Sequence, residues 1–410
     1  MRLLFLTPQL PYPPHQGTAL RNWGLIKSLS ARHTITLLTF AGENESITPE
    51  LRAVCRQIET VPPPHRITRL RLRNLFLSPL PDLAHRLGSG EFSSRLSALL
   101  AANRFDALCV EGLELAPYIF TAEYAENAEK KKNEISARAA LSAVKIIFDA
   151  HNAETLLQRR AFETDLRRPR RWPVALYSFI QSRRLARFEA EACRRVNHVN
   201  CVSVEDAAAL QMLVPDLKPV IVPNGIFLSD YIPVTRHPSP VPQLVFTGKM
   251  DYRPNVDAVT WFATDILPLI QREKPESQFI IVGQKPVEAV QRLSERTGVV
   301  VTGAVDDARP YIANATVYVV PLRMGGGTRF KLLEAMALKR PIVSTAIGAE
   351  GFAVQHGREL LLADTAAEFA DAVLILLKDE AKQNALSTAG YEFVKDYDWE
   401  KIVPKVEAIL

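Results

Sequence analysis

The chain has 410 residues, of which 47% are hydrophobic and 23% are charged, a balance typical of folded globular proteins. A chain of this length predicts two domains, each able to bury a core of its own. No apolar run reaches the roughly 18 residues needed to span a bilayer, and the first residues predict a strand and not a signal peptide. We therefore expect a cytoplasmic protein.

Positive charge is concentrated in the first half of the chain. Residues 1–233 carry 30 Lys or Arg and 23 Asp or Glu, whereas the remainder carries 20 and 22. Two stretches, 66–73 and 159–195, place arginines beside apolar residues, which suits contact with an anionic membrane. A solvated helix face explains the pattern equally well, so both interpretations stay open. We expect no nucleic-acid partner, because no aromatic reading platform accompanies the charge.

The cysteines give no sign of a metal site. Cys55, Cys109, Cys193 and Cys201 are scattered and form no C-x-x-C pair. Cys193, His198 and Cys201 lie close in sequence, but their spacing matches no common zinc pattern. We predict no bound metal.

Strand-like apolar runs alternate with helical stretches along the first half of the chain. The predicted strands are residues 2–7, 34–40, 107–111, 145–149, 198–202 and 219–222. The predicted helices include residues 18–31 and the arginine-rich stretch 175–195, and the highly charged stretch 123–138 is either a solvated helix or an insertion. This alternation predicts a parallel α/β sheet.

The second half repeats this architecture. Its predicted strands are residues 243–247, 278–282, 299–302, 316–321, 341–345 and 359–362, and its predicted helices are residues 254–270, 287–295, 309–313, 329–338, 366–377 and 399–410. The proline-rich stretch 231–242 is typical of an interdomain linker. We therefore predict an α/β protein with two Rossmann-like domains, residues 1–232 and 233–395, followed by a C-terminal helical segment, residues 396–410. Ligands in such sheets bind beyond the carboxyl ends of the strands.

Residues 325–341 carry the strongest functional signal. A predicted strand runs into three glycines, and the predicted helix that follows carries Arg329, Lys331 and Glu334. Glycines let the backbone approach a ligand closely, and a helix N-terminus offers unpaired N–H groups to an anion. Two cations in the first turn oppose the helix dipole, which an anion such as a diphosphate would offset. Glu334 could accept hydrogen bonds from ribose or sugar hydroxyls, so we interpret this segment as a nucleotide-sugar site.

Four motifs give the chain a recognisable pattern. They are the glycine loop at Gly17 after the first strand, Val222-Pro223-Asn224-Gly225, Phe246-Thr247-Gly248-Lys249 and the specific motif Lys331-Leu332-Leu333-Glu334-Ala335-Met336-Ala337. In these motifs the chain resembles retaining glycosyltransferases of family 4, which have the GT-B fold of two Rossmann-like domains facing a central cleft. The resemblance implies sugar transfer from a nucleotide-sugar, without a metal and with retained anomeric configuration. It also implies that the C-terminal helix, residues 396–410, crosses back to the first domain.

The resemblance assigns roles to the second domain's residues. Lys249 and Lys331 meet the donor diphosphate and Glu334 binds the ribose, while the local spacing adds Arg329 as a second phosphate contact. Lys331 could instead be an exposed helix lysine, and Glu334 could pair back to it. The predicted donor-binding set is Gly17, Lys249, Gly325, Gly326, Gly327, Thr328, Arg329, Lys331 and Glu334.

One position departs from the family pattern. The family commonly carries a glutamate eight positions before its ribose-binding glutamate, and that residue contacts the transferred sugar. Here the position is Gly326. We expect the backbone amides of Gly325, Gly326 and Gly327 to take over part of this contact.

In the first domain, His151 follows the predicted strand 145–149 in Asp149-Ala150-His151-Asn152, where the family places a histidine near the reacting sugar. The predicted catalytic residues are therefore His151, Lys249 and Lys331. His151 could also be a structural histidine in a turn, Asp149 either orients it or caps the next helix, and Gly17 could be a plain turn residue. Residues 302–307 are expected to line the base pocket, and their types do not distinguish uridine from guanosine.

The expected function is transfer of a sugar to a glycan or lipid-linked acceptor in exopolysaccharide or cell-envelope glycan synthesis, at the inner face of the plasma membrane. No cofactor is expected beyond the donor substrate, a UDP- or GDP-linked sugar. Two alternatives remain. One is a nucleotide-sugar epimerase on the same fold. The other is a catalytically silent nucleotide-sugar-binding assembly subunit, which the glycine at position 326 would favour.

Overall fold

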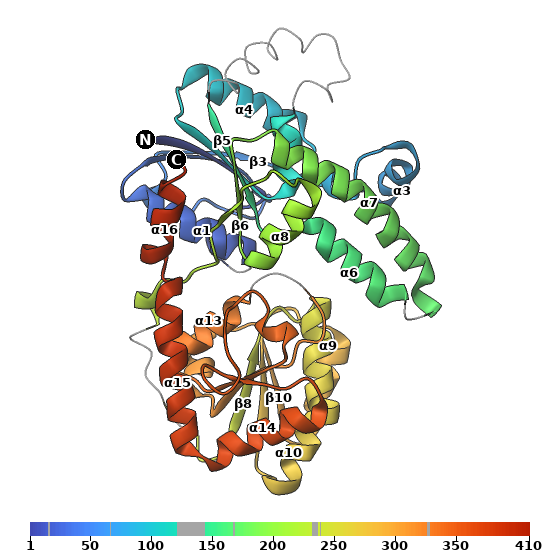
Figure 1. Cartoon of the computed structure of the whole chain (residues 1–410), viewed down its shortest axis with the longest axis vertical. Coiled ribbons are helices and arrows are strands. Elements are labelled where there is room, and N and C mark those ends of the chain that lie inside the picture. Colours follow the sequence, from blue (N-terminus) through green and yellow to red (C-terminus); the bar gives the residue numbers. More distant parts are fainter. Residues whose placement is uncertain are drawn as a thin grey trace. The chain divides into compact units, whose positions relative to one another are not determined.

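The computed structural model describes residues 1–14, 17–65, 67–120, 144–166, 169–231, 237, 239–325 and 329–410. The predicted charged stretch 123–138 lies outside these residues. The chain forms two compact units (Figure 1): unit 1 comprises Met1–Pro223 and Val403–Leu410, and unit 2 comprises Asn224–Ile402. In the described part of the chain, no helix combines the length and the apolar character needed to cross a bilayer.

Unit 1 is built on a seven-stranded parallel sheet in the order β3-β2-β1-β4-β5-β6-β7. In sheet order the strands are β3 (Gln57–Val61), β2 (Thr34–Phe40), β1 (Arg2–Thr7), β4 (Ala107–Glu111), β5 (Lys145–Ala150), β6 (His198–Cys201) and β7 (Val220–Ile221). Strands β2, β1, β4 and β5 are almost wholly buried, because helices flank a parallel sheet. The edge strand β3 is half-buried and was not expected from the sequence.

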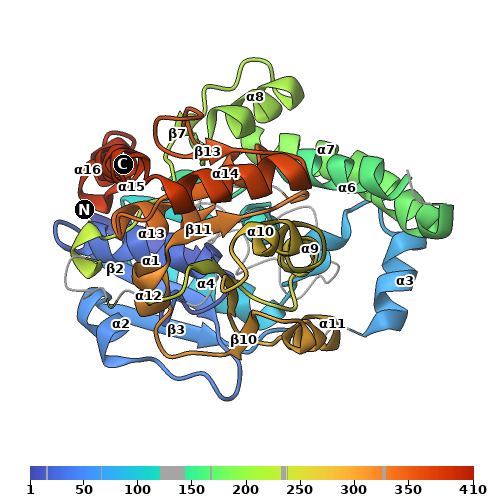
Figure 2. The same ribbon diagram turned by 90° about the horizontal axis from the view of Figure 1, so that it is seen from below.

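The helices of unit 1 follow the strands along the chain. They are α1 (Gly17–Ser30), α2 (Pro49–Val54), α3 (Thr68–Leu77), α4 (Gly90–Ala102), α6 (Glu154–Leu166), α7 (Trp172–Arg194) and α8 (Val204–Leu213), joined at the C-terminus by the end of α16 (Trp399–Glu407). Side-chain caps start several of them, since Thr48, Ser89 and Ser203 each accept a hydrogen bond from a backbone N–H of the first turn. Helices α6 and α7 lie side by side, with α3 next to α7 (Figure 2).

Unit 2 contains a six-stranded parallel sheet in the order β10-β9-β8-β11-β12-β13. In sheet order the strands are β10 (Val299–Gly303), β9 (Gln278–Val282), β8 (Gln243–Thr247), β11 (Val317–Val320), β12 (Ile342–Ser344) and β13 (Leu361–Leu362). Its helices are α9 (Arg253–Trp261), α10 (Leu267–Glu273), α11 (Glu288–Gln291), α12 (Arg309–Asn314), α13 (Phe330–Ala337), α14 (Ala366–Lys378), α15 (Glu380–Val394) and the start of α16. The predicted helix 254–270 is interrupted by a π-helical turn, Phe262–Ile266.

The chain enters and leaves unit 2 along two segments that are bonded to each other. Ile226 N–H donates to the Tyr397 carbonyl (2.9 Å), and Trp399 N–H donates to the Ile226 carbonyl (3.0 Å). Gly225 makes this approach feasible, because a Cβ there would lie 2.5 Å from Ile402 Cδ1 and 2.9 Å from the Tyr397 carbonyl oxygen. The two connections of unit 2 are therefore fastened side by side.

Candidate active site

Two polar clusters, one in each unit, contain sequence-predicted residues. In unit 2 they gather after strand β8 and at the start of helix α13. In unit 1 they gather at the carboxyl ends of β4 and β5. Both places are where parallel α/β sheets bind ligands.

Lys331, in the first turn of α13, is the central cation of unit 2. Its Nζ donates to Asn255 Oδ1 (3.1 Å) and lies 3.9 Å from the centroid of the Phe246 ring. Asn255 is fixed in turn, because its Nδ2 donates to the Lys249 carbonyl (3.0 Å). The pKa of Lys331 is lowered to about 7. Burial is the largest cause, and the lowering effect of the Arg329 charge exceeds the raising effect of the Glu334 charge. The protein itself thus disfavours the charged form of this lysine, and a bound anion would restore it.

Two glycines make room around this lysine. A Cβ at Gly248 would lie 2.7 Å from Asn255 Nδ2 and 3.1 Å from Lys331 Nζ, so any larger residue would displace the pair. Gly325 has a φ of +113°, which L residues rarely adopt, and a Cβ there would lie 3.2 Å from Arg329 Nη2. Gly248 and Gly325 therefore allow the backbone to approach these cationic side chains closely.

Glu334 lies one turn after Lys331, but the two described residues do not form an ion pair with each other. Glu334 Oε1 instead accepts a hydrogen bond from the Tyr231 hydroxyl (3.2 Å). Burial raises the pKa of Glu334, and burial beside Glu334 raises the pKa of Tyr231 well above its ordinary value. Tyr231 therefore remains a neutral donor to Glu334 across the physiological pH range.

A third cation stands beside this carboxylate. Arg309, at the start of α12, pairs with Asp307 (2.9 Å) and donates to the Asp230 carbonyl (2.6 Å). Its charge lowers the pKa of Glu334, against the larger effect of burial. Asp307 belongs to the loop predicted to line the base pocket, which follows β10. Arg309 therefore links this loop to Asp230, the residue before Tyr231.

The remaining predicted donor-binding residues are placed as follows. Lys249 follows β8, is partly exposed and pairs with Asp251 (Nζ–Oδ1, 3.5 Å). Arg329 is the N-cap residue of α13 and not part of its first turn, since the helix begins at Phe330. Gly326, Gly327 and Thr328 lie outside the described residues. Their predicted contacts with the donor stay predictions, as do those of Lys249 and Arg329.

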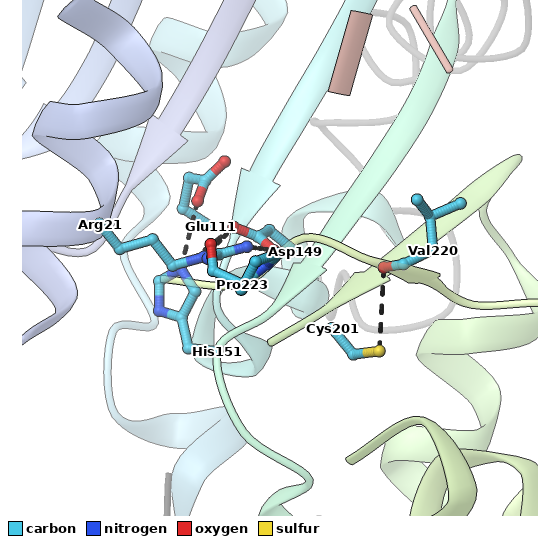
Figure 3. A network of polar contacts seen from close by, with 7 residues as sticks. All are labelled: Arg21, Glu111, Asp149, His151, Cys201, Val220 and Pro223. Atoms are coloured by element: carbon cyan, nitrogen blue, oxygen red, sulfur yellow. Dashed lines mark hydrogen bonds and ion pairs between the residues drawn. The ribbon is translucent and has the colours of Figure 1, made fainter. Parts of the chain in front are cut away.

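In unit 1, a buried arginine organises the polar cluster (Figure 3). Arg21, from the first turns of α1, makes two hydrogen bonds to Asp149, Nε to Oδ2 (2.7 Å) and Nη2 to Oδ1 (2.8 Å), and a third to the Pro223 carbonyl (3.3 Å). Both charged side chains are 2% exposed. Desolvation by burial opposes ionisation of Asp149, but Arg21 more than offsets it, so the pKa of Asp149 is lowered. The pair is charged and satisfied within the protein.

His151 belongs to the same cluster. Its Nε2 lies 3.1 Å from Glu111 Oε2 and 3.7 Å from Asp149 Oδ2. Burial and the adjacent Asp149 raise the pKa of Glu111 well above its ordinary value, and burial lowers the pKa of His151. The raised pKa favours the protonated form of Glu111, the lowered pKa favours the neutral ring of His151, and Nε2 is the ring nitrogen that contacts Glu111.

Glu111, Asp149 and His151 place three metal-binding types of atom within 4.8 Å of one another. The chemistry of the donor set argues against a cation there. Arg21 already engages both oxygens of Asp149 and adds a positive charge, while the raised pKa of Glu111 favours its protonated form. This arrangement fits a self-contained network better than a metal site. Gly17 begins α1 on the exposed surface, and its predicted place beside the donor stays a prediction.

Four residues of these clusters were not predicted from the sequence: Arg21, Glu111, Tyr231 and Arg309. Glu111 ends the predicted strand 107–111, so the sequence could have placed it beside Asp149 at the carboxyl end of the sheet. The position of Arg21, one helical turn after Gly17, is weaker evidence for a role in the site. Tyr231 belongs to the predicted linker and Arg309 begins α12, and nothing in the local sequence pattern indicates their partners.

Comparison with known proteins adds a family. Residues 241–379 match the profile described as "Glycosyl transferases group 1". The match lies within unit 2 and covers less than half of the chain. An uncharacterised 44.6 kDa protein of the Klebsiella pneumoniae cps region is 23% identical over 45% of this chain and 51% of its own length. A phosphatidyl-myo-inositol mannosyltransferase of Mycobacterium leprae is 29% identical over 46% of this chain and 52% of its own. The chain thus matches about half the length of these relatives.

Solved structures resemble the chain over its whole length. Sucrose-phosphate synthase from Thermosynechococcus elongatus is 17% identical, with a TM-score of 0.71 covering 100% of this chain and 98% of the other. HepE of Anabaena, in complex with UDP and glucose, is 13% identical, with a TM-score of 0.64 and the same coverage. At such identities the likeness establishes the fold. The prediction of two Rossmann-like domains of the GT-B class is confirmed.

Proposed function

We propose that the protein is a retaining glycosyltransferase of family 4 that moves a sugar from a UDP- or GDP-linked donor to a glycan or lipid-linked acceptor. The match of residues 241–379 to the glycosyl transferases group 1 family supports sugar transfer. The local geometry of unit 2 supports the nature of the donor. The decisive observation is Lys331, a lysine whose pKa is lowered to about 7 beside a second cation and a glycine loop.

The charges of the donor diphosphate and of the cations in unit 2 are complementary. A nucleotide-sugar carries its negative charge on the diphosphate, and this group becomes more negative when the bond to the sugar breaks. Lys331 and Arg329 lie near each other, so each raises the cost of charging the other. An anion beside them removes that cost. Because the anion's charge grows in the transition state, these cations stabilise the transition state more than the ground state.

The neighbouring groups suit the rest of a nucleotide. Glu334 offers a carboxylate to ribose hydroxyls, in competition with its bond to Tyr231. The loop that follows β10 offers backbone groups to a base, as predicted from the sequence. Lys249, on the loop after β8, supplies a further cation for the diphosphate.

The proposed reaction needs no carboxylate nucleophile. The anomeric C–O bond to the diphosphate breaks with its electron pair, and the acceptor hydroxyl forms a new bond on the same face of the sugar. The acceptor proton passes to an oxygen of the departing diphosphate. His151, neutral and held by Glu111, donates a hydrogen bond from Nδ1 to a hydroxyl of the sugar, a role that rests on the resemblance to family 4.

The setting of the reaction is also a proposal. The relative encoded in the Klebsiella cps region and the Mycobacterium mannosyltransferase, whose name specifies a phosphatidylinositol acceptor, support synthesis of an envelope glycan or glycolipid. The arginine-rich segments of unit 1 support peripheral contact with an anionic membrane at the inner face of the plasma membrane.

Donor binding is tested by thermal shift against UDP, GDP and their hexose conjugates. A ligand present at about 100 times its Kd stabilises the folded state by about 2.7 kcal/mol. We expect one nucleotide class to raise the melting temperature of the native protein and not that of Lys331→Ala. The matched control is Lys378→Ala, an exposed lysine of unit 2, which should keep the shift. Absence of a shift with every nucleotide-sugar would contradict the proposal.

Transfer is tested by NMR on the product. An α-linked donor sugar should give an α-linked product with glycan or glycolipid acceptors. Conversion of the donor into another nucleotide-sugar without any acceptor would indicate an epimerase. Tight donor binding with neither transfer nor hydrolysis would indicate a silent binding subunit.

A further inference from the structure

Helix α7 carries an exposed apolar stripe that the proposed chemistry does not use. The stripe consists of Trp172, Leu176 and Phe179, which are 58%, 60% and 39% exposed. Their spacing places them on one face of the helix, and Arg183 and Arg187 continue the same face. The opposite face is buried, through residues such as Leu185 and Phe188. The stripe is therefore an outward surface of a helix that is already packed against unit 1.

The stripe is held in place by its neighbours. Trp172 Nε1 donates to the Leu166 carbonyl at the end of α6 (3.2 Å). The Phe179 ring packs against the Phe162 ring with centroids 5.4 Å apart, and the Arg183 guanidinium lies 5.1 Å from the Phe179 centroid. These contacts fix the orientation of large rings that remain open to solvent. Isolated exposed apolar residues are normal, but an aligned and ordered row indicates a binding surface.

The charge around the stripe is strongly positive. Among the described residues between 159 and 187, seven are arginines, none is a lysine and two are acidic. Both acids are neutralised within the hairpin: Glu163 pairs with Arg159 (3.0 Å) and the buried Asp165 with Arg171 (2.8 Å). Long arginine side chains can extend beside an apolar stripe and reach charged groups at its edge.

Helix α3 adds a second apolar element next to α7 (Figures 1 and 2). Arg184 of α7 donates to the Leu75 carbonyl at the end of α3 (2.7 Å), which fixes the two helices to each other. The next two residues, Phe76 and Leu77, are 80% and 78% exposed. Both helices thus present apolar side chains among arginines.

We propose that this docking face, consisting of Trp172, Leu176, Phe179, Arg183 and Arg187 and extended by the end of α3, seats the protein on an anionic lipid bilayer. Aromatic and aliphatic side chains enter the boundary between headgroups and acyl chains, while arginines bind lipid phosphates. A second copy of the chain is a poorer occupant, because a symmetric contact would bring two such arginine clusters together. The inference extends the proposed function by naming the surface that meets a lipid, and it depends on that function only for the identity of the acceptor.

The protein carries its own reporter for this surface. Three of its four tryptophans are buried, Trp23 (9% exposed), Trp261 (6%) and Trp399 (1%), and Trp172 alone of the four is exposed. We expect its emission to shift to the blue when vesicles of phosphatidylglycerol and phosphatidylcholine in equal parts are added to the full-length protein. Brominated lipids should quench it. Vesicles of phosphatidylcholine alone, or high salt, should weaken both effects.

Variants separate the apolar from the electrostatic contribution. Leu176→Ser should lower the vesicle partition coefficient about tenfold, and Arg183→Gln and Arg187→Gln about fivefold each. Trp172→Phe should abolish the fluorescence change and retain sedimentation with vesicles. Met212→Ser (75% exposed, on α8) and the exposed Arg52→Gln are matched controls and should bind as the native protein does.

Three results would overturn the proposal. They are equal binding to neutral and anionic vesicles, binding without a change in Trp172 emission, and a dimer that Leu176→Asp dissociates. Donor thermal shifts measured on the same variants keep this outcome separate from the proposed function. A variant of the docking face that loses vesicle binding but still shows a thermal shift with the donor supports the docking face. If the native protein shows no thermal shift with any donor, that result contradicts the proposed function of unit 2 and leaves the docking face unaffected.

Discussion

The two polar clusters differ in how their buried charged side chains are stabilised. In unit 1, Arg21 and Asp149 neutralise each other through two hydrogen bonds, and the pKa shifts of Glu111 and His151 favour the uncharged forms of both. In unit 2, Lys331 has an amide and an aromatic ring for partners, and the charge that most affects its pKa is that of another cation, Arg329. The charged pair of the first cluster is neutralised within the protein, whereas the proposed donor would bring an anion to the second. This difference is consistent with the proposed roles, orientation by the first cluster and donor binding by the second.

The largest effect is expected from breaking the completed pair. Arg21→Leu leaves Asp149 buried without its counter-charge, and the free energy of unfolding should fall by about 3–5 kcal/mol. Chemical denaturation measures this. The control Arg95→Leu removes an exposed arginine that pairs with Glu59 at 3.4 Å and should cost less than about 1 kcal/mol. Equal costs for the two variants would mean that the buried pair contributes nothing special.

The next largest effect is catalytic. Lys331→Ala should lower kcat/KM by a factor of about 100 to 1,000, because one cation facing the leaving diphosphate is lost. Steady-state transfer kinetics measure it, with Lys378→Ala as the control. Activity within threefold of the native enzyme would remove Lys331 from the mechanism.

Glu111 distinguishes orientation from charge. Glu111→Leu leaves His151 without its anchor and should lower kcat roughly tenfold to a hundredfold. Glu111→Gln supplies a neutral donor in the same place and should restore most of the activity, because the raised pKa of the native carboxyl favours its protonated form. If Gln were as damaging as Leu, the ionised carboxylate would be the required form.

Donor binding should depend on pH through Lys331. The pKa of Lys331 is about 7 in the free protein, so the Kd for a nucleotide-sugar should be constant below pH 7 and rise about tenfold per pH unit above it. The unfolded state binds more protons than the folded state between pH 7 and the ordinary lysine pKa, so Lys331 makes unfolding free energy rise with pH in that window. Calorimetry at several pH values measures both slopes, and Lys331→Met should remove them. A flat Kd would show that Lys331 stays charged without ligand.

The smallest effect is expected at Tyr231. Tyr231→Phe deletes the hydroxyl that donates to Glu334 and should cost about 1 kcal/mol of unfolding free energy. Tyr252→Phe, at a side chain that is 52% exposed, is the control and should be neutral. Urea titration resolves the difference. An unchanged midpoint for Tyr231→Phe would mean that water replaces the bond at no cost.

The sequence predicted the buried parts of the fold better than its margins. Inner strands such as 34–40 and 243–247 are almost wholly buried and rich in apolar and β-branched residues, so their pattern is easily recognised. The edge strand β3 contains Glu59 and is half-buried, and therefore lacks that pattern. The turn at Phe262–Ile266 lies within a longer helical pattern, so its π-helical geometry leaves no sequence mark.

The candidate site divides in the same way. Lys331 and Glu334 were predictable because a glycine loop and a helix motif place them at fixed offsets. The Tyr231 contact joins residues 103 positions apart and the Arg21 contact residues 128 apart, and such pairings depend on tertiary structure. The raised pKa of Glu111 and the lowered pKa of Lys331 depend on burial, which only the folded chain defines.

The fastening of residues 226 and 397–399 has a mechanical consequence. The polypeptide crosses between the units twice, near Asn224 and near Ile402, and the two crossings share backbone hydrogen bonds inside unit 2. The start and the end of unit 2 are therefore held together within that unit. A side chain at Gly225 would collide with Ile402 and the Tyr397 carbonyl, so a larger residue there should disturb this pairing.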